Sequence, residues 1–355
     1  MKINIIGYLG FHNIGDDLML IGLLNELNNR KCFSINIFMK DEVCLKSYID
    51  NWTNLTINII KLSTVTNIFL PYYIFSSDST IWCGGTCFYE DPNDKQLNGL
   101  KWIKKIAFYT RIFKKNLFFL NIGANNLITL KSKKIMHNII KSTTAVSVRD
   151  LESLNNLQNY FLDNDRRFIG GDLAFLSMEP RNFLRDSGDY ILFCGHNQYT
   201  SDKTVVEFYA KNLVELSINL NKKIIFFPFH GGKNSDNLFH LEICKFFKLN
   251  VEYKIIEETN LDNMVGMFKK AYIVISMRLH ALIFSELLSK PNIGINYNNK
   301  VAYFIEKTKN ISESRIKEVG DEILAEDARY VCDNYKSNNQ FIIKERHDAI
   351  KGIIV

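Results

Sequence analysis

Short apolar runs alternate with amphipathic segments along most of the chain. Several runs are rich in β-branched residues and have the length of buried strands. In the first half they predict strands at residues 3–6, 35–38, 57–60, 79–83, 116–122, 144–148 and 167–169. Leucines at helical spacing predict an amphipathic helix from Leu18 to Asn28. Each strand ends in Gly or polar residues, and this alternation is typical of parallel α/β layers.

A second series follows a Pro- and Gly-containing stretch at residues 178–188, which we interpret as a linker. Its predicted strands are residues 190–194, 223–227, 251–255, 272–275 and 292–295, and its main helices are 204–220, 236–247 and 261–270. We therefore predict an α/β protein with two Rossmann-like domains facing across a cleft. The predicted domains are residues 1–177 and 189–330, followed by a helical extension at 331–355.

The stretch from Ser276 to Phe284 joins one predicted strand to a helix that stops near Pro291. Arg278 and His280 thus lie at the carboxyl end of a strand, where open α/β sheets bind ligands. Backbone N–H groups at a helix start also attract anions. A permanent cation beside an imidazole suggests an anionic substrate and a proton transfer. The alternative is that Arg278 is a surface charge and His280 an ordinary helix residue.

Glycine-rich loops follow two other predicted strands. The first, from Gly7 to Asp17, does not have the G-x-G-x-x-G spacing of a dinucleotide site, but Gly10 and Gly15 allow a tight loop with exposed N–H groups. Either Asn13 or Asp16 is a candidate helix cap. The pair Asp16–Asp17 then leaves one carboxylate as a base or a sugar-hydroxyl ligand. The second loop contains Gly84 and Gly85, with Asp91 after it; in a parallel sheet both loops point into the same cleft.

Two further side chains follow predicted strands. Arg149 comes directly before Asp150, so it is either a cleft cation or the surface neighbour of a capped helix. His230 lies in the loop Phe227-Pro228-Phe229-His230-Gly231-Gly232 and is either a second cleft histidine or a loop residue.

Composition narrows the classes of function. A net charge of +6 is spread over a Lys-rich chain without a basic tail or nucleic-acid motif, so we expect no nucleic-acid partner. Seven scattered cysteines favour reduced thiols, and Cys83 and Cys87 lack a second pair at zinc spacing. No metal site is evident. Without a signal-peptide pattern or an apolar run of transmembrane length, we expect a cytoplasmic protein.

The segment from Lys101 to Lys115 is basic and aromatic. Trp102, Ile106, Tyr109 and Phe113 share one helical face, and the basic side chains lie mostly elsewhere. Such a helix can rest on the inner face of an anionic membrane or bind a lipid-diphosphate acceptor. An ordinary helix with a solvated Lys face has the same pattern, and the Lys-rich background favours it.

Five blocks in order resemble the polysaccharide pyruvyl transferase family. The opening Gly7-Tyr8-Leu9-Gly10-Phe11-His12-Asn13-Ile14-Gly15-Asp16-Asp17 resembles its G-Y-x-G-x-x-N-x-G-D-[DE] start. Trp82-Cys83-Gly84-Gly85 with Asp91 is similar to its G-G-G-x-x-x-Q-D segment, although Cys83 and Glu90 depart from it. The other blocks are Ser147-Val148-Arg149-Asp150, Asp172-Leu173-Ala174-Phe175 and Ser276-Met277-Arg278-Leu279-His280-Ala281, the last with Tyr297 to Val301 downstream.

The resemblance implies a fold like that of GT-B glycosyltransferases. It also implies transfer of the enolpyruvyl group of phosphoenolpyruvate to a sugar of a glycan or lipid-linked oligosaccharide, without a further cofactor. Arg278, His280 and Arg149 would bind the donor, with His280 as the acid or a phosphate ligand. Asp16 or Asp17 would accept the hydroxyl proton, and Gly10, Asn13, Gly15, Gly84, Gly85, Asp91 and His230 would line the acceptor and cleft loops. A nucleotide-sugar transferase and a non-catalytic sugar-binding protein are the alternatives.

Overall fold

The computed structural model describes residues 1–30, 33–42, 45, 48–90, 97–161, 167–183, 188–247, 251–257, 261–298, 300–308 and 315–353. The chain forms two units. Unit 1 comprises Met1–Phe11, Asp16–Ser177 and Lys344–Val355, and unit 2 comprises His12–Gly15 and Met178–Ile343. The change of unit after Ser177 falls where the predicted linker begins.

Unit 1 contains a parallel sheet with the strand order β3-β2-β1-β4-β6-β7-β8, and β5 pairs with β6. The strands are β1 (Lys2–Ile6), β2 (Phe33–Met39), β3 (Leu55–Lys61), β4 (Ser79–Cys83), β5 (Thr86–Phe88), β6 (Asn116–Ala124), β7 (Ala145–Val148) and β8 (Arg167–Ile169). The order reverses between β1 and β4, which is the position where a Rossmann-like sheet binds ligands. The carboxyl ends of β1, β4 and β7 carry the loops after Ile6, Cys83 and Val148, respectively.

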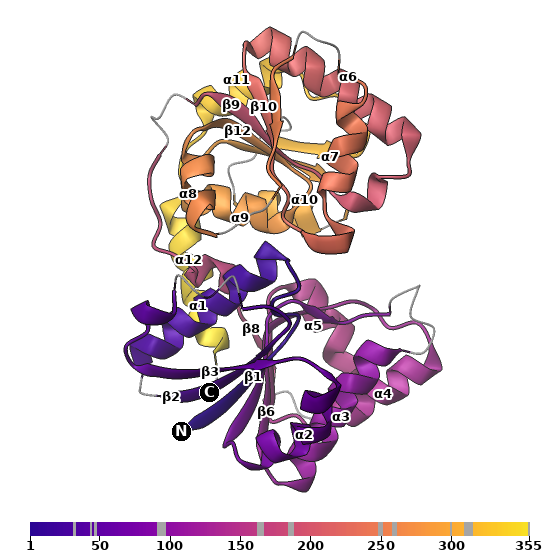
Figure 1. Ribbon diagram of the computed structural model, residues 1–355, viewed down its shortest axis with the longest axis vertical. Helices are drawn as coiled ribbons and strands as arrows, with labels where there is room; N and C mark the ends of the chain where they lie inside the picture. Colours follow the sequence, from indigo (N-terminus) through magenta and orange to yellow (C-terminus); the bar gives the residue numbers. More distant parts are fainter. Residues whose placement is uncertain are drawn as a thin grey trace. The chain divides into compact units, whose positions relative to one another are not determined.

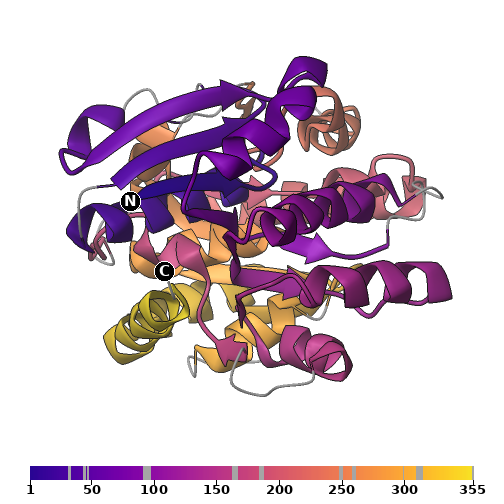
Figure 2. The ribbon, with the colours of Figure 1, turned by 90° about the horizontal axis from the view of Figure 1, so that it is seen from below.

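Helices lie on both faces of this sheet (Figures 1 and 2). They are α1 (Ile14–Arg30), α2 (Thr64–Phe75), α3 (Asn98–Ile112), α4 (Leu130–Ile140) and α5 (Leu151–Leu157), with short 3-10 turns at Ile49–Asn51, Gln158–Tyr160 and Leu173–Leu176. The sequence repeats Ile-Asn-Ile in β1 and β2, and the paired asparagines are buried. Asn36 donates to Asn4 at 2.9 Å and Asn4 donates to Ser77 at 2.9 Å, so these amides are satisfied within the core.

Unit 2 contains a second parallel sheet with the order β11-β10-β9-β12-β13-β14. Its strands are β9 (Tyr190–Cys194), β10 (Lys223–Phe226), β11 (Tyr253–Ile255), β12 (Ala271–Ser276), β13 (Asn292–Asn296) and β14 (Ile316–Glu318). Its helices are α6 (Lys203–Leu220), α7 (Asn237–Cys244), α8 (Leu261–Lys269), α9 (Leu279–Leu287), α10 (Lys300–Lys307) and α11 (Ala325–Asn334), with 3-10 turns at Asn197–Tyr199 and Gly232–Asn234. The order reverses between β9 and β12, so the loops after these strands meet at the switch point.

The end of the chain, predicted as a helical extension, belongs partly to each unit. Helix α12 (Asn339–Gly352) begins in unit 2 and ends in unit 1. In unit 2, the ring of Phe341 packs against Phe304. In unit 1, Ser147 donates to the carbonyl of Gly352 at 2.6 Å and Asn121 donates to that of Ala349 at 3.2 Å. Residues 331–355 are therefore integral to the two units, because they contribute apolar contacts to one and buried hydrogen bonds to the other.

Candidate functional site: a cationic cluster at the strand ends of unit 2

Arg278 is held by its own turn at the end of β12. It is the residue before helix α9, with an extended backbone at φ −93° and ψ 118°. The Ser276 hydroxyl accepts a hydrogen bond from the N–H of Arg278 at 2.8 Å and donates to the Arg278 carbonyl at 3.0 Å. The two hydrogen bonds between the Ser276 hydroxyl and the backbone of Arg278 thus fix the backbone position from which the Arg278 side chain extends.

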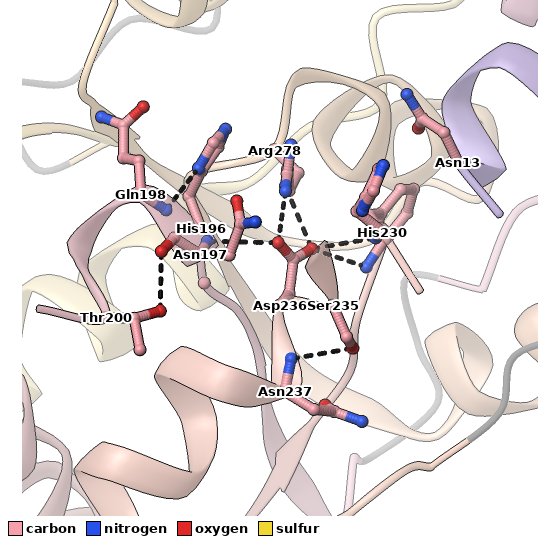
Figure 3. A network of polar contacts seen from close by, with 12 residues as sticks. Asn13, His196, Asn197, Gln198, Thr200, His230, Ser235, Asp236, Asn237 and Arg278 are labelled. Atoms are coloured by element: carbon pink, nitrogen blue, oxygen red, sulfur yellow. Dashed lines mark hydrogen bonds and ion pairs between the residues drawn. The ribbon is translucent and has the colours of Figure 1, made fainter. Parts of the chain in front are cut away.

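Asp236 anchors the guanidinium from below (Figure 3). Its carboxylate is fully buried and forms an ion pair with Arg278 through Nε, at 3.1 Å, and through Nη2. It also accepts backbone N–H bonds from Phe229 at 3.0 Å, His230 at 2.9 Å and Asn197 at 3.2 Å. One carboxylate therefore ties together the loops that follow β9, β10 and β12.

This ion pair changes how Arg278 can bind an anion. A guanidinium offers five N–H groups, and Asp236 occupies those on the Nε–Nη2 edge. The end formed by Nη1 and the second N–H of Nη2 is the edge on which an oxyanion can still bind bidentately. The guanidinium is therefore preoriented by a carboxylate on its side edge.

His196 lies beside this pair and is neutral. Burial, followed by the nearby charge of Arg278, lowers the pKa of His196 to about 3. Its Nδ1 accepts the N–H of Gln198 at 3.2 Å, so the neutral ring carries its proton on Nε2 and offers a donor there. The ring contacts that of Tyr297 at a centroid distance of 4.6 Å, and Nζ of Lys300 lies 5.3 Å from the Tyr297 ring centroid. Lys300 also contributes positive charge that disfavours protonation of His196.

His280 packs against a glycine from the start of the chain. It is the second residue of α9, and a Cβ at Gly15 would overlap Nδ1 of its imidazole. The segment His12–Gly15 is fastened to the loop after β10: Ile14 donates to the carbonyl of Phe229 at 3.0 Å and Gly231 donates to that of His12 at 2.7 Å. Asn13 pairs with His230 in an antiparallel bridge, and Figure 3 shows both side chains. The Asn13 side chain accepts the N–H of Gly15 at 3.1 Å. Gly15 is required here because only a residue without Cβ leaves room for the imidazole.

A second polar cluster lies at the strand ends of unit 1. Asp16 is in the first turn of α1, and a Cβ at Gly85 would come within 3.2 Å of its Oδ1. Gly84 and Gly85 have φ values of +50° and +68°, a conformation that favours glycine. Burial raises the pKa of the Cys83 thiol, and the charges of Asp16 and Asp172 raise it further. Both carboxylates therefore lie near the end of β4.

Arg149 belongs to this unit 1 cluster and is mostly buried. It contacts Asp150 at 3.2 Å and Asp172 at 3.8 Å, and it donates to the hydroxyl of Thr86 at 3.2 Å. Asp150 caps α5 by accepting the N–H of Ser153 at 2.7 Å. Asp150 is thus a helix cap, as one of the two interpretations of the sequence predicted. That interpretation also required Arg149 to be on the surface, which it is not.

Gly10 also lies in unit 1, with φ +69°, where a Cβ would overlap the backbone of Asp41. Asp91 is outside the described residues. Within the described part of the chain, no three His, Cys, Asp or Glu side chains are grouped as a metal site would require.

A family model decides the membership of the chain. The polysaccharide pyruvyl transferase model matches residues 13–299, most of the sequence. The chain belongs to the polysaccharide pyruvyl transferase family. No curated protein matches the sequence.

Solved structures confirm the fold predicted for this pyruvyl transferase family member. A UDP-GlcNAc 2-epimerase from Methanocaldococcus jannaschii matches with a TM-score of 0.65 and 12% identity over 99% of this chain and 98% of that one. The Neisseria meningitidis UDP-GlcNAc 2-epimerase bound to UDP-GlcNAc matches with a TM-score of 0.62 and 11% identity over 100% of both chains. Anabaena HepE in complex with UDP-glucose matches with a TM-score of 0.56 and 10% identity, covering 99% of this chain and 94% of its own. At these identities the likeness shows a GT-B-like fold of two Rossmann-like units, and no more.

Sequence reasoning missed three side chains of the unit 2 cluster. Asp236, His196 and Lys300 are absent from the predicted site, although each follows a strand of the sheet. The signal used for Arg278, a polar residue just beyond a strand, also applies to His196 in Cys194-Gly195-His196. Asp236 lies ten residues beyond the end of β10 and six beyond His230, so only the folded loop brings it to Arg278.

Proposed function

We propose that the protein transfers the enolpyruvyl group of phosphoenolpyruvate onto a sugar of a cell-surface polysaccharide or its lipid-linked precursor, with release of phosphate. The observation that carries the proposal is the preoriented Arg278, flanked by His196 and Lys300 at the strand ends of unit 2. Family membership supports the reaction class.

The unit 2 cluster suits a donor with two anionic groups. Phosphoenolpyruvate carries a phosphate and a carboxylate, which together need several donors. The end-on edge of Arg278, the Nε2–H of His196 and the ammonium of Lys300 supply them, and each charge-assisted bond is worth about 1.5–3 kcal/mol. Asp236 offsets part of the positive charge, so the site holds its cations in place before the donor arrives.

The reaction then requires proton transfers at defined atoms. A proton is added to the methylene carbon, and a sugar hydroxyl attacks the neighbouring carbon and loses its proton. The bond from that carbon to the phosphate oxygen then breaks, and a second hydroxyl closes the ketal while its proton passes to the departing phosphate. We assign to His280 either donation of the proton to the methylene carbon or binding of the departing phosphate, because an imidazole exchanges protons near neutral pH.

Unit 1 supplies the groups proposed for the acceptor. Asp16 or Asp17 would take the hydroxyl proton, and Gly10, Gly84 and Gly85, which are buried and have positive φ values, would set the turns of the acceptor loops. Arg149 is proposed to add positive charge for the donor, although Asp150 and Asp172 already balance it within unit 1. In unit 2, Asn13, Gly15 and His230 would shape the loops at the strand ends.

A nucleotide-sugar transferase is the second candidate, because the similar structures include complexes with UDP, UDP-glucose and UDP-GlcNAc. Such an enzyme commonly uses a Glu to bind the ribose. Glu286 of unit 2 is one candidate for this role, but it is fully buried and accepts hydrogen bonds from Arg315 and Tyr335, each at 2.7 Å. It is therefore a structural member of the unit 2 core. Glu257 is another candidate, and Glu258 lies outside the described residues.

Thermal-shift screening of the whole protein separates the candidates. Stabilisation by phosphoenolpyruvate, followed by phosphate release with an acceptor glycan, supports the proposal. Stabilisation only by UDP-, GDP- or CMP-sugars would replace it with the glycosyltransferase. Donor binding without phosphate release from any acceptor would favour a non-catalytic binding protein.

We further propose that the protein acts in the cytoplasm, on an acceptor presented at the inner face of the membrane. Within the described residues, no helix is long and apolar enough to cross a membrane. Any membrane contact would then be peripheral, and residues 101–115 were the predicted segment for it.

A further inference from the structure

Helix α2 has apolar side chains on both of its faces. The inner face buries Leu70 and Ile74 in the core of unit 1. The outer face exposes five large side chains at helical spacing: Val65 (61%), Ile68 (69%), Phe69 (54%), Tyr72 (63%) and Phe75 (60%). Helices that are apolar all round are normally buried, and a contiguous exposed apolar stripe marks an interaction surface.

Basic side chains of the neighbouring helix border this stripe. Lys105 and Trp102 of α3 donate to the backbone and side chain of Asn67, both at 3.2 Å, so α3 lies directly beside α2. At the other end, Nζ of Lys115 lies 5.9 Å from the ring centroid of Phe75. The exposed side chains of α3 are Asn98, Lys101, Lys104, Lys105, Phe108, Arg111 and Ile112. Neither helix contains an acidic residue.

We propose that the face formed by α2 and α3, here called the α2–α3 face, binds the surface of an anionic lipid membrane. The apolar stripe of α2 would enter the boundary between headgroups and acyl chains, and the cations of α3 would bind the headgroups. This assignment differs from the sequence interpretation, which gave the apolar contact to α3. On α3, Ile106 is buried and Trp102 is half-buried, so the helix uses its aromatic face for the core of unit 1.

Charge favours a lipid surface over a second copy of this chain. In a twofold-symmetric dimer, the same patch meets itself. Two α2–α3 faces would then bring their cations together without any acidic residue from either helix to balance them. An anionic membrane balances the same charge, and its apolar interior accommodates Ile68, Phe69 and Tyr72.

Vesicle co-sedimentation of the full-length protein tests the proposal. Two vesicle types are compared: phosphatidylcholine mixed with phosphatidylglycerol, and phosphatidylcholine alone. One variant carries Ile68→Ser, Phe69→Ser and Tyr72→Ser, and a second carries Lys101→Gln, Lys104→Gln and Lys105→Gln. The matched control carries Ile218→Ser, Leu241→Ser and Tyr330→Ser, which remove similarly exposed apolar side chains from unit 2.

We expect the wild type and the control to bind the mixed vesicles, with weaker binding at high salt. Loss of three lysines should weaken binding by about a hundredfold, since each contributes roughly fivefold at an anionic surface. The serine variant should lose binding to the mixed vesicles. Melting curves like that of the wild type will show that these variants are folded, because the replaced side chains are exposed.

Two results would overturn the inference. One is vesicle binding that is unchanged in the serine variant. The other is a dimer of the wild type that dissociates in the serine variant while neither the wild type nor any variant binds vesicles. The inference is independent of the proposed reaction: failure of phosphoenolpyruvate to stabilise the wild type would remove the proposed function and leave the vesicle result standing.

Discussion

Asp236→Asn tests the view that a buried carboxylate positions Arg278. The substitution keeps the shape of the side chain and removes its charge. In the native protein, Oδ2 accepts from the N–H groups of Phe229 and His230 and from Nε of Arg278. Oδ1 accepts from Asn197 and from Nη2 of Arg278. An amide has only one oxygen, so at best it keeps the first three donors and turns an NH₂ group toward the other two.

The expected loss of stability follows from that geometry. Asp236 is fully buried and Arg278 is mostly buried, and removing one partner of a buried ion pair costs about 3–5 kcal/mol. That loss is smaller than the total stability of most domains, about 5–15 kcal/mol, so the variant should still fold. Transfer should fall by about a hundredfold or more, because a displacement of about 1 Å in a positioning group has that effect.

Urea unfolding followed by circular dichroism, together with phosphate release, measures both effects. Asp333→Asn is the matched control, because Asp333 is exposed and the same change there should cost less than about 0.5 kcal/mol. Adding Arg278→Gln completes a double-mutant cycle, and the double variant should lose about 1–3 kcal/mol less than the sum of the single losses. A loss below about 1 kcal/mol for Asp236→Asn with normal phosphate release would refute the reasoning.

Further outcomes follow from the same site. Arg278→Lys and His280→Ala should each abolish phosphate release without unfolding the protein; normal ketal formation by either variant would contradict their assigned roles. Gly15→Ala should impair transfer and cost about 1–3 kcal/mol through overlap with His280, whereas Gly266→Ala, with open space around it in α8, should stabilise the protein by about 0.5–1 kcal/mol. Burial lowers the pKa of His240 from 6.5 to about 4, so between these values the unfolded chain binds the extra proton and stability rises with pH. Lowering the pH from about 7 to 5 should reduce the free energy of unfolding by about 2 kcal/mol through this residue. The urea midpoint of His240→Gln should therefore depend less on pH than that of the wild type, and an equal dependence in both proteins would disprove this.

Local sequence patterns were sufficient to predict the α/β architecture with two parallel sheets. A buried parallel strand needs a short apolar run and a polar exit, and both are visible without tertiary contacts in Ala271–Ser276 or Ser79–Cys83. The three-residue strands β14 and β5 were missed, whereas β8, which is equally short, was predicted.

Residues next to a strand end were predictable candidates for the site, because chain connectivity alone places Arg278 and His280 at the edge of the sheet. Their partners were not. Asp236 reaches Arg278 across 42 positions of sequence, and Gly15 meets His280 across many more. Such pairings depend on which loops the strand order brings together, and no local periodicity encodes that order.

The sequence by itself therefore determined the fold class, the family blocks and the cation at the end of β12. The tertiary structure alone decided that Asp236 occupies one edge of Arg278, that Glu286 belongs to the core and that Arg149 lies among carboxylates. It also decided that α2 keeps an apolar face exposed beside a basic helix. The physical reason is that hydrogen bonding and burial are properties of neighbours in space, whereas sequence patterns report only neighbours along the chain.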